Sequence, residues 1–505
     1  MEHLKELVAI VNKRKLSQIE ILDKSLLSRK DTLFSRLYEG IASDQIHSDE
    51  EAMQLLYPKD KNAAASYRKL KSRFKERLLN TLYFIDINHT AGDINSKKAY
   101  FDCVNKLYLS NILLRYAENR QASVQLIIEN YPLAKKNNFF DILKEYAYKL
   151  MAHYGLNGQE KKYNEAYEDY LYFCKEYDLE QKAQLIYTRV LMVLNQPKKT
   201  PAERTAVMQQ AIDELKPLTK ASASLVTYFM YTRVQLFYFE YIGDYTNINH
   251  TCDRYLKEYR KYLYSILSEN YLNTIYIYKL KSLYDLRNNE EALQLIETIL
   301  PFAKGLSYLA VKEFEVKIYL QQQQTAKAGE TIAQLQAMAV FKQGSHALKE
   351  RWIVYTAYTE FLQQYLHKGQ FKFGLARFLN NIPLTSLDKS GFNVAARIIT
   401  VLFYLGRNDL DHAVQQIEAL KVYQQRHLKE AENLRSTLFI RLLGIMEKHS
   451  FNYKELKKPK EYIQLKEQYA RHRIPENEII PYDMLWEITL DILYQNDMQL
   501  LEKWT

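Results

Sequence analysis

The side chains with the clearest potential for chemistry are the basic residues of a short segment, residues 59–77. Eight basic residues against two acidic ones, Asp60 and Glu76, give this segment a net charge of +6, more than half of the chain's +10. The basic residues are Lys59, Lys61, Arg68, Lys69, Lys71, Arg73, Lys75 and Arg77. Lysine and arginine neutralise phosphates in complexes with nucleic acid. Arg68, Lys71 and Lys75 are therefore candidate nucleic-acid-binding residues.

Three helices, over about 32–42, 48–56 and 62–86, are expected to present this segment. Ser48 and Glu51 form an S-x-x-E capping box, which marks a helix start, and Pro58 ends the second helix before the third begins. The apolar stripe of the third helix is expected to be Tyr67, Leu70, Phe74, Leu78 and Leu82. A short helix, a turn and a longer basic helix form the outline of a helix-turn-helix or winged-helix unit that binds DNA.

Two other interpretations of the basic helix stay open. The turn is longer than the usual 3 to 4 residues, and a basic helix face is commonly only solvated. The unit is then an N-terminal cap on the rest of the chain, or a surface that binds a protein or another acidic surface. The alternatives separate on whether Arg68, Lys71 and Lys75 project together from an exposed face or are covered by the next helix near residues 99–109.

The sequence lacks the motifs of the common catalytic chemistries. It contains no G-x-x-x-x-G-K-[ST], G-x-G-x-x-G, H-E-x-x-H or G-x-S-x-G. The eleven histidines are scattered, and Cys103, Cys174 and Cys252 are too far apart for a CxxC zinc pair or a disulfide framework. We therefore expect no catalytic site, no cofactor and no metal. The cysteine pattern, the absence of a signal-type segment and the lack of an apolar run of bilayer length favour a cytoplasmic protein that does not enter a membrane.

Composition and periodicity predict an all-α fold. The 505 residues include only 13 Gly and 10 Pro, too few for a turn-rich β fold. From Phe101 onward, apolar residues recur at i, i+3, i+4 and i+7, the pattern of amphipathic helices. Short polar turns such as residues 287–289 separate consecutive helices and predict antiparallel hairpins. One hairpin cannot bury both of its apolar stripes, so the hairpins are expected to stack.

A recurring register connects these hairpins. The position early in each second helix is small in all units but one: Ala166, Ile248, Ala292, Ala328, Gly374 and Ala413. Four residues later stand Tyr170, Cys252, Ile296, Ile332, Phe378 and Ile417. Seven residues later stand Phe173, Tyr255, Ile299, Leu335, Asn381 and Leu420, of which only Asn381 is polar. The spacings from Ile248 onward are 44, 36, 46 and 39 residues.

The turn that opens these second helices resembles the G-D-Y-x-x-A-like turn of the tetratricopeptide repeat family. Residues 243–245, 287–292 and 161–166 carry the resemblance, which covers roughly residues 100–455. It implies a right-handed α-solenoid that binds a protein or peptide on a concave surface lined by the first helices of the pairs. The chain departs from the family period of 34 residues and has bulky residues where the family expects a small one, so the repeats are degenerate.

The resemblance also implies which residues face the groove: Arg233, Phe237, Ile277, Lys281, Tyr284, Glu313 and Lys317. Lys281 and Lys317 occupy equivalent places in consecutive units, and Arg233 lies one unit earlier. Such a basic ladder would hold the carboxylates of an acidic or C-terminal peptide by charge-assisted hydrogen bonds. Arg233, Phe237, Lys281, Tyr284 and Lys317 are the candidate peptide-binding residues. The alternative is that these lysines are ordinary solvated side chains.

The predicted organisation is an N-terminal helical unit with the long basic helix (1–98), the TPR-like helical repeats (99–455), and a basic connection with a C-terminal capping helix near 482–496 (456–505). The first functional hypothesis is a non-catalytic scaffold that binds a protein or peptide. The alternative is a DNA-binding transcriptional regulator with a helix-turn-helix-like N-terminal unit and a TPR-like sensor domain. A third hypothesis, an enzyme with a cryptic site, requires convergent polar residues in a deep pocket.

Overall fold

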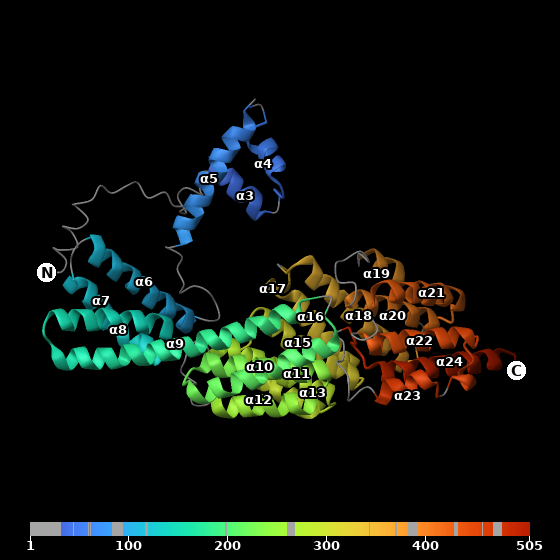
Figure 1. The fold of residues 1–505 in the computed structure, drawn as a ribbon. Helices are drawn as coiled ribbons and strands as arrows, with labels where there is room; N and C mark the ends of the chain where they lie inside the picture. The colour runs from blue at the N-terminus through green and yellow to red at the C-terminus, as the bar shows by residue number, and fades with distance from the viewer. Residues whose placement is uncertain are drawn as a thin grey trace. The chain divides into compact units, whose positions relative to one another are not determined.

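Every regular element among the described residues is a helix (Figure 1). The computed structural model describes residues 32–504 except 44, 59, 61, 83–93, 117–119, 197–198, 260–267, 343, 369–370, 382–390, 429–432, 457 and 468–476. The chain divides into two compact units, residues 1–170 and 171–505. The all-α prediction is confirmed for this part of the chain. None of the described helices combines the length and the apolar character needed to cross a lipid bilayer.

The helices of the first unit are α3 (Leu33–Ala42), α4 (Asp49–Leu56), α5 (Ala63–Leu82), α6 (Ile94–Tyr116), α7 (Arg120–Lys136) and α8 (Phe140–Leu156). Helix α9 (Glu160–Leu194) contains the boundary between the units. The remaining elements are α10 (Pro201–Ala221), α11 (Leu225–Ile242), α12 (Tyr245–Tyr259), α13 (Ser268–Asp285), α14 (Asn289–Ile299), α15 (Leu306–Gln321), α16 (Thr325–Ala337), α17 (Ala339–Lys342), α18 (His346–Leu366), α19 (Leu375–Asn381), α20 (Phe392–Gly406), α21 (Leu410–His427), α22 (Leu434–Lys448), η3 (Tyr453–Glu455), α23 (Lys460–Glu467) and α24 (Tyr482–Trp504).

Helices α3, α4 and α5 occupy the ranges that the sequence predicted. The Ser48 hydroxyl accepts from the Glu51 N–H, and the Glu51 carboxylate accepts from the N–H of His47, so the capping box closes one residue earlier than expected. A small core forms between the three helices from Leu37, Ala52, Leu56, Tyr67, Leu70 and Phe74. Leu78 is exposed, so the predicted stripe was wrong at this position. Helices of 10 and 8 residues rise only about 15 and 12 Å and cannot cover the whole of the 20-residue α5. The predicted stripe also included Leu82, whose side chain lies outside the described part of the structure. Residues 83–86, the predicted end of the helix, lie outside it as well.

The predicted repeat register falls on buried positions in most units. Ile248, Ala292, Ala328 and Ala413 are fully buried, and so are the residues four positions later in the same units. Gly374 is the exception, because it lies before α19 begins and is exposed. The prediction was therefore wrong at Gly374, whereas Phe378, four residues later on α19, is buried as the register predicted. The Asn381 side chain lies outside the described part.

The turns between paired helices repeat the same backbone geometry. Gly243, Arg287, Gln323 and Asn408 have positive φ angles between 56° and 73°, and each lies five residues before its register position. The residue after each turn donates its N–H to the carbonyl oxygen five residues earlier, at 2.8–2.9 Å: Asp244 to Phe239, Asn288 to Leu283, Gln324 to Tyr319 and Asp409 to Tyr404. This is the 6→1 bond of a Schellman motif, which satisfies a terminal helix carbonyl. Four turns of different sequence thus end their first helices in the same way.

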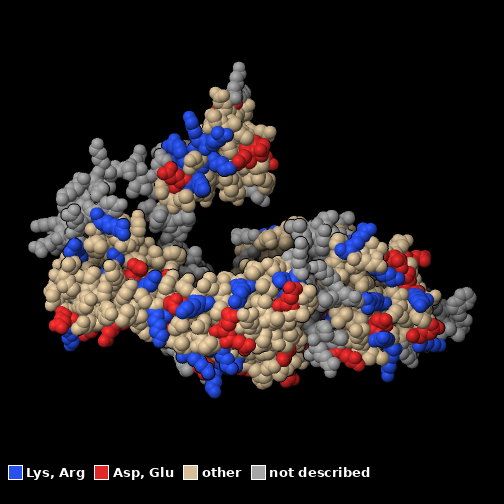
Figure 2. All heavy atoms as spheres, in the orientation of Figure 1, with Lys and Arg blue, Asp and Glu red and all other residues tan. Residues whose placement is uncertain are grey.

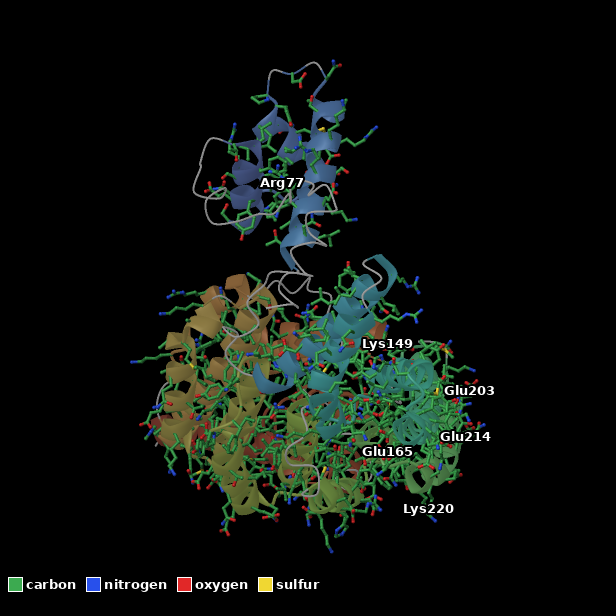
Figure 3. All side chains as sticks on the ribbon, turned by 90° about the vertical axis from the view of Figure 1, so that its left-hand side faces the viewer. Arg77, Lys149, Glu165, Glu203, Glu214 and Lys220 are labelled. Carbon is green, nitrogen blue, oxygen red and sulfur yellow. The ribbon has the colours of Figure 1, made fainter. Side chains whose placement is uncertain are left out.

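Consecutive helices of the second unit pack on one another from α10 to α16 and onward through α18, α20, α21 and α22. Helix α10 begins with a complete capping box between Thr200 and Glu203, of which Glu203 is labelled in Figure 3. Among the described residues, the largest apolar core is formed by the helices from α15 to α24, and it includes Trp352, Phe361, Phe403 and Trp486.

The C-terminal segment folds back onto earlier helices. The predicted core residues of α24 are buried, namely Leu485, Trp486, Ile488, Ile492 and Leu493, and α24 contacts α20, α22 and α23. Helix α24 extends beyond residue 496, where the sequence predicted its end, and the expected basic connection contains the helix α23. The Tyr284 hydroxyl donates to the Ile479 carbonyl oxygen (3.4 Å), a contact across 195 residues. The segment before α24 therefore helps to build the surface at α13.

Candidate functional site

The basic residues of α5 divide between two sides of the helix. Arg68, Lys71 and Lys75 are all exposed, and their spacing of three and four residues places them on one face. Arg77, labelled in Figure 3, instead lies over the ring of Phe34 on α3, with 4.1 Å between the guanidinium carbon and the ring centroid. Figure 2 shows Lys and Arg atoms gathered over α5 beside the acidic atoms of α4.

One member of this exposed face is ion-paired. The Lys71 ammonium lies 2.7 Å from both carboxylate oxygens of Asp49, the first residue of α4. Hydrogen bonds from Lys71 and Tyr67 lower the pKa of Asp49. Both partners of the pair are about half exposed, so the pair contributes little to stability and can exchange for another anion. Arg68, Lys71 and Lys75 are thus exposed together on one face of α5.

The predicted peptide-binding residues come from α11, α13 and α15, and three of them converge on one cavity. This cavity, called the smaller cavity below, has a volume of about 310 Å³. It is lined by Lys281, Tyr284 and Lys317 together with Ile277 and Glu313, which the resemblance also places in the groove. Its other lining residues are Glu240, Tyr278, Asp285, Ala310, Phe314, Arg351 and Glu478. Arg233 and Phe237 do not line it.

Arg233 and Phe237 pack beside this smaller cavity. The Arg233 guanidinium lies 4.5 Å from the Phe237 ring centroid and 5.1 Å from that of Tyr278, which lines the cavity. Burial, with the Glu240 carboxylate as a smaller cause, raises the pKa of Tyr278, so its hydroxyl stays protonated. All five predicted residues therefore belong to one neighbourhood.

The lysines of the smaller cavity are neither a free basic ladder nor solvated side chains. Lys281 forms a hydrogen-bonded ion pair with Glu240 from α11. The Lys317 ammonium is buried, lies 3.8 Å from Glu313 Oε1, and sits 6.0 Å from the Tyr284 ring centroid. Arg351 from α18 donates to the same Glu313 oxygen at 2.6 Å. Each cation thus has a carboxylate partner within the protein.

Asp285, the last residue of α13, is the unusual group of this region. Only 3% of the residue is exposed, and its Oδ2 has no hydrogen-bond partner. Burial raises its pKa to about 7, an effect that Lys281 and Lys317 oppose and Glu478 and Glu240 reinforce. A buried polar atom without a partner is rare in folded proteins and costs free energy. No sequence pattern predicted this residue, since a carboxylate at a helix end has no distinguishing signal.

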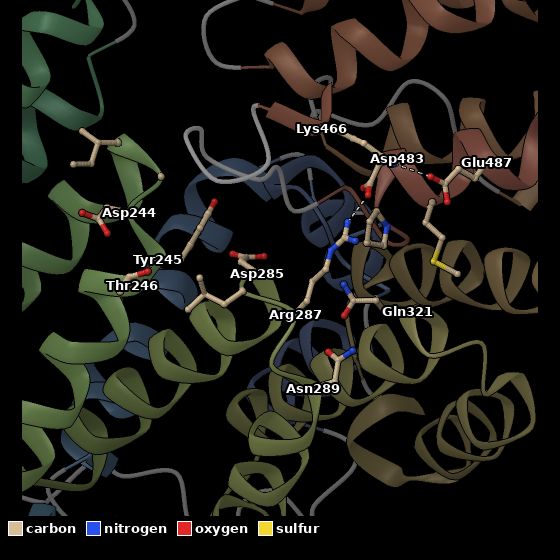
Figure 4. Close-up of a pocket in the computed structure, with 15 residues that line it drawn as sticks. Asp244, Tyr245, Thr246, Asp285, Arg287, Asn289, Gln321, Lys466, Asp483 and Glu487 are labelled. Atoms are coloured by element: carbon tan, nitrogen blue, oxygen red, sulfur yellow. Dashed lines mark hydrogen bonds and ion pairs between the residues drawn. The ribbon is translucent and has the colours of Figure 1, made fainter. Parts of the chain in front are cut away.

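Asp285 also lines a larger pocket of about 1120 Å³ (Figure 4). Turns of three successive helix pairs form part of its wall, with Ile242–Thr246 at the first, Asp285–Arg287 and Asn289 at the second, and Gln321 at the third. The returning C-terminal segment closes another part with Lys466, Pro481, Asp483, Met484 and Glu487. The sequence motif of the turns could have indicated Asp244 and Asn289, but no local pattern could have indicated the C-terminal residues.

Both cations of the larger pocket are already paired. Arg287 donates to Asp483 at 2.5 Å, and the Lys466 ammonium lies 2.9 Å from Glu487, as the dashed lines of Figure 4 show. Five buried side-chain atoms of its lining residues have no hydrogen-bond partner: the acceptors Asp285 Oδ2, Asn289 Oδ1, Gln321 Oε1 and Asp483 Oδ1, and the donor Gln321 Nε2. The described residues that line this pocket include no serine, cysteine or histidine, so they hold no nucleophile paired with an imidazole base. The described part of the chain also has no cluster of three potential metal ligands. The unpartnered acceptors of this wall can bind hydrogen-bond donors.

Replacing Asp285 by asparagine is expected to make the protein more stable above pH 7. The carboxylate has a pKa of about 7 in the folded protein against 3.8 in an exposed aspartate. The folded state therefore loses stability as the pH rises from about 4 to about 7, and this loss is complete above pH 7. The asparagine side chain carries no charge, so the gain in unfolding free energy should grow from near zero at pH 4 to as much as about 4 kcal/mol at pH 8. Urea denaturation at pH 4, 6 and 8 measures it, and a gain that does not change with pH would contradict the buried carboxylate.

The sequence resemblance and the geometry are the grounds for a functional assignment. The resemblance to the tetratricopeptide repeat family stays a prediction. Comparisons with protein-family models, with curated proteins and with solved structures gave no match to this chain.

Proposed function

We propose that this chain is a cytoplasmic, non-catalytic scaffold that binds a protein or peptide, built as a TPR-like right-handed α-solenoid over its helix pairs. The observation that carries the proposal is the larger pocket, because its wall combines the turns of three successive helix pairs with unpartnered buried polar atoms. A surface assembled from successive turns can follow an extended ligand, and N–H groups of a ligand can pair the unpartnered acceptors. The recurring Schellman turns support the repeat architecture.

The acidic character expected for the partner has less support than partner binding itself. That expectation depended on free charges at Lys281 and Lys317. Both lysines have carboxylate partners inside the protein. An acidic partner would have to displace Glu240 and Glu313, and the proposal therefore does not require one.

Blocking the larger pocket tests this function. Thr246 is exposed, lines the pocket, and lies in the first turn of α12, so Thr246→Trp fills the opening without disturbing a core. The matched control is Thr298→Trp, at an exposed position of α14 that does not line the pocket. Proteins retained from host-cell lysate by the wild type and both variants are quantified by mass spectrometry, and the affinity of each candidate is then measured with purified proteins.

A partner should bind the wild type and the Thr298 variant equally and bind the Thr246 variant at least tenfold more weakly. Equal binding by all three proteins would show that the pocket does not take part. If the purified wild type bound none of the retained proteins, the scaffold proposal would fail.

A second function, DNA contact by the N-terminal unit, is favoured by one observation: Arg68, Lys71 and Lys75 share one exposed face of α5. We propose it as the alternative, with the helix pairs acting as a sensor or interaction domain. The face has the charge that phosphates attract, and the ion pair between Lys71 and Asp49 is a weak, half-exposed one.

Changing Arg68, Lys71 and Lys75 to alanine is expected to weaken DNA binding and flatten its salt dependence. Each phosphate contact contributes about 0.9 to the slope of log K against log salt concentration, so three lost contacts should reduce the slope by about 2.7. The measurement is fluorescence anisotropy with a labelled random duplex across a salt series. A control variant replaces three exposed lysines of α9 and α10, Lys175, Lys216 and Lys220, and should keep the wild-type slope. Absence of binding at low salt, or equal slopes in all three proteins, would exclude DNA contact by this face.

A further inference from the structure

The charges around the larger pocket are opposite in sign to the charge of the whole chain. Its described lining carries four carboxylates, on Asp244, Asp285, Asp483 and Glu487, against two cations, whereas the chain as a whole has a net charge of +10. Asp483 and Glu487 are already paired with the two cations. The charge that remains uncompensated by an ion pair inside the pocket therefore belongs to Asp244 and Asp285.

The two remaining carboxylates differ in how they are satisfied. The Asp244 carboxylate accepts hydrogen bonds from the N–H of Asn247 (3.0 Å) and from the Asn247 side-chain amide (2.7 Å). It therefore caps the N-terminus of α12. Asp285 Oδ2 accepts no hydrogen bond, although only 3% of the residue is exposed. Asp285 Oδ2 is thus a buried acceptor to which no group of the described protein donates a hydrogen bond.

The hydrogen-bonding capacity of the wall points to the same kind of ligand. The unpartnered oxygens of Asn289, Gln321 and Asp483 line the same pocket as Asp285. Four unpartnered acceptors against one unpartnered donor, Gln321 Nε2, favour a ligand with more donors than acceptors. A lysine ammonium offers three N–H donors and no acceptor, and an arginine guanidinium offers five.

We infer that the larger pocket holds a lysine or arginine side chain of a bound peptide, with Asp285 as its charge partner. This inference rests on the proposed function and specifies the partner's chemistry at this pocket. A cationic side chain pairs the lone carboxylate, offers its remaining N–H groups to the neighbouring amide oxygens, and leaves both existing ion pairs in place. At about 1120 Å³, the pocket also has room for the flanking backbone of the peptide.

The charged groups around Asp285 make the interaction depend on pH. They are Lys281 on its own helix, Lys317 on α15, Glu240 on α11, and Glu478 on the segment before α24. Their combined effect and burial bring the pKa of Asp285 to about 7. The carboxylate is therefore mostly protonated at pH 6 and ionised at pH 8, and a cation should bind more tightly at pH 8.

Three dye-labelled nonapeptide mixtures test the inference. Each has four randomised residues on either side of a central arginine, lysine or citrulline, and citrulline keeps the shape of arginine without its charge. Retention on the immobilised full-length protein is measured at pH 6 and pH 8. The variants are Asp285→Asn and, as a control with the same substitution, Asp213→Asn at an exposed position of α10.

The wild type and the Asp213 variant should retain the arginine and lysine mixtures at least tenfold more than the citrulline mixture at pH 8, and less at pH 6. The Asp285 variant should lose this preference and its pH dependence. Equal retention of arginine and citrulline by the wild type would overturn the cation site, and so would an unchanged preference in the Asp285 variant. Either result leaves the proposed function standing if Thr246→Trp still releases a partner, so the two failures are distinguishable.

Discussion

Replacing Ile296 by aspartate is expected to unfold the helix pairs of the second unit. Ile296 is 1% exposed and belongs to the core between α13, α14 and α15. The change removes a buried side chain worth about 2–5 kcal/mol and buries a polar group without a hydrogen-bond partner, at a cost of about 2–7 kcal/mol. The sum reaches the total stability of an ordinary domain, about 5–15 kcal/mol. Circular dichroism and thermal denaturation of the purified variant measure the loss of helix.

Two control variants and a second buried position test whether the effect of Ile296→Asp follows from the predicted register. Thr298→Asp, at an exposed position two residues later on α14, should leave the melting temperature nearly unchanged, and Ile296→Val should cost only about 0.5–1.5 kcal/mol. Ile417→Asp changes the equivalent, fully buried position of α21 and should act like Ile296→Asp. A fully helical Ile296→Asp protein with an unchanged melting temperature would contradict the register.

The second large effect is expected from Glu478→Gln, which leaves a buried guanidinium without its counter-charge. Arg435 on α22 is 1% exposed and donates two hydrogen bonds to the Glu478 carboxylate, at 2.7 and 2.5 Å, and a third to the Leu465 carbonyl oxygen at 2.9 Å. Removing one partner of a buried pair costs about 3–5 kcal/mol, because the remaining charge stays desolvated. Asp483 Oδ1 lies 4.0 Å from the same guanidinium and offsets only part of that cost.

The matched control uses the same substitution in an exposed ion pair. Lys466 and Glu487 are more than half exposed, so Glu487→Gln should change the free energy of unfolding by less than about 1 kcal/mol. Urea denaturation compares the two variants. Equal, small losses would mean that the Arg435–Glu478 pair does not fasten the C-terminal segment. A large loss for Glu478→Gln alone would show that this segment is fixed to α22 by charge as well as by apolar packing.

Much of the N-terminal unit and of the repeat register could be predicted because both depend on residues close together in the sequence. The Ser48–Glu51 cap and the buried positions four residues apart on each helix involve contacts within one turn. Leu78 shows the limit of such local information. Its spacing fits the stripe of α5, yet whether it is covered depends on the lengths of two other helices.

The predicted groove residues illustrate the same division. The family resemblance named Lys281, Tyr284 and Lys317 from different helices, and the structure brings them into one cavity. The resemblance could not predict that carboxylates inside the protein neutralise these lysines, since Glu240 pairs with Lys281 across 41 residues. A position on a helix face is local information, whereas the partner of a side chain comes from whichever element packs opposite.

The sequence by itself determined the all-α class, the positions of the N-terminal helices and the spacing that places Arg68, Lys71 and Lys75 on one face of a helix. These properties follow from helix periodicity and from caps that act over three or four residues. Only the tertiary structure decided the larger pocket and the state of Asp285. Arg287 meets Asp483 across 196 residues, and the burial that raises the pKa of Asp285 depends on several helices at once. Desolvation depends on everything that surrounds a group, so no local pattern of residues could have encoded it.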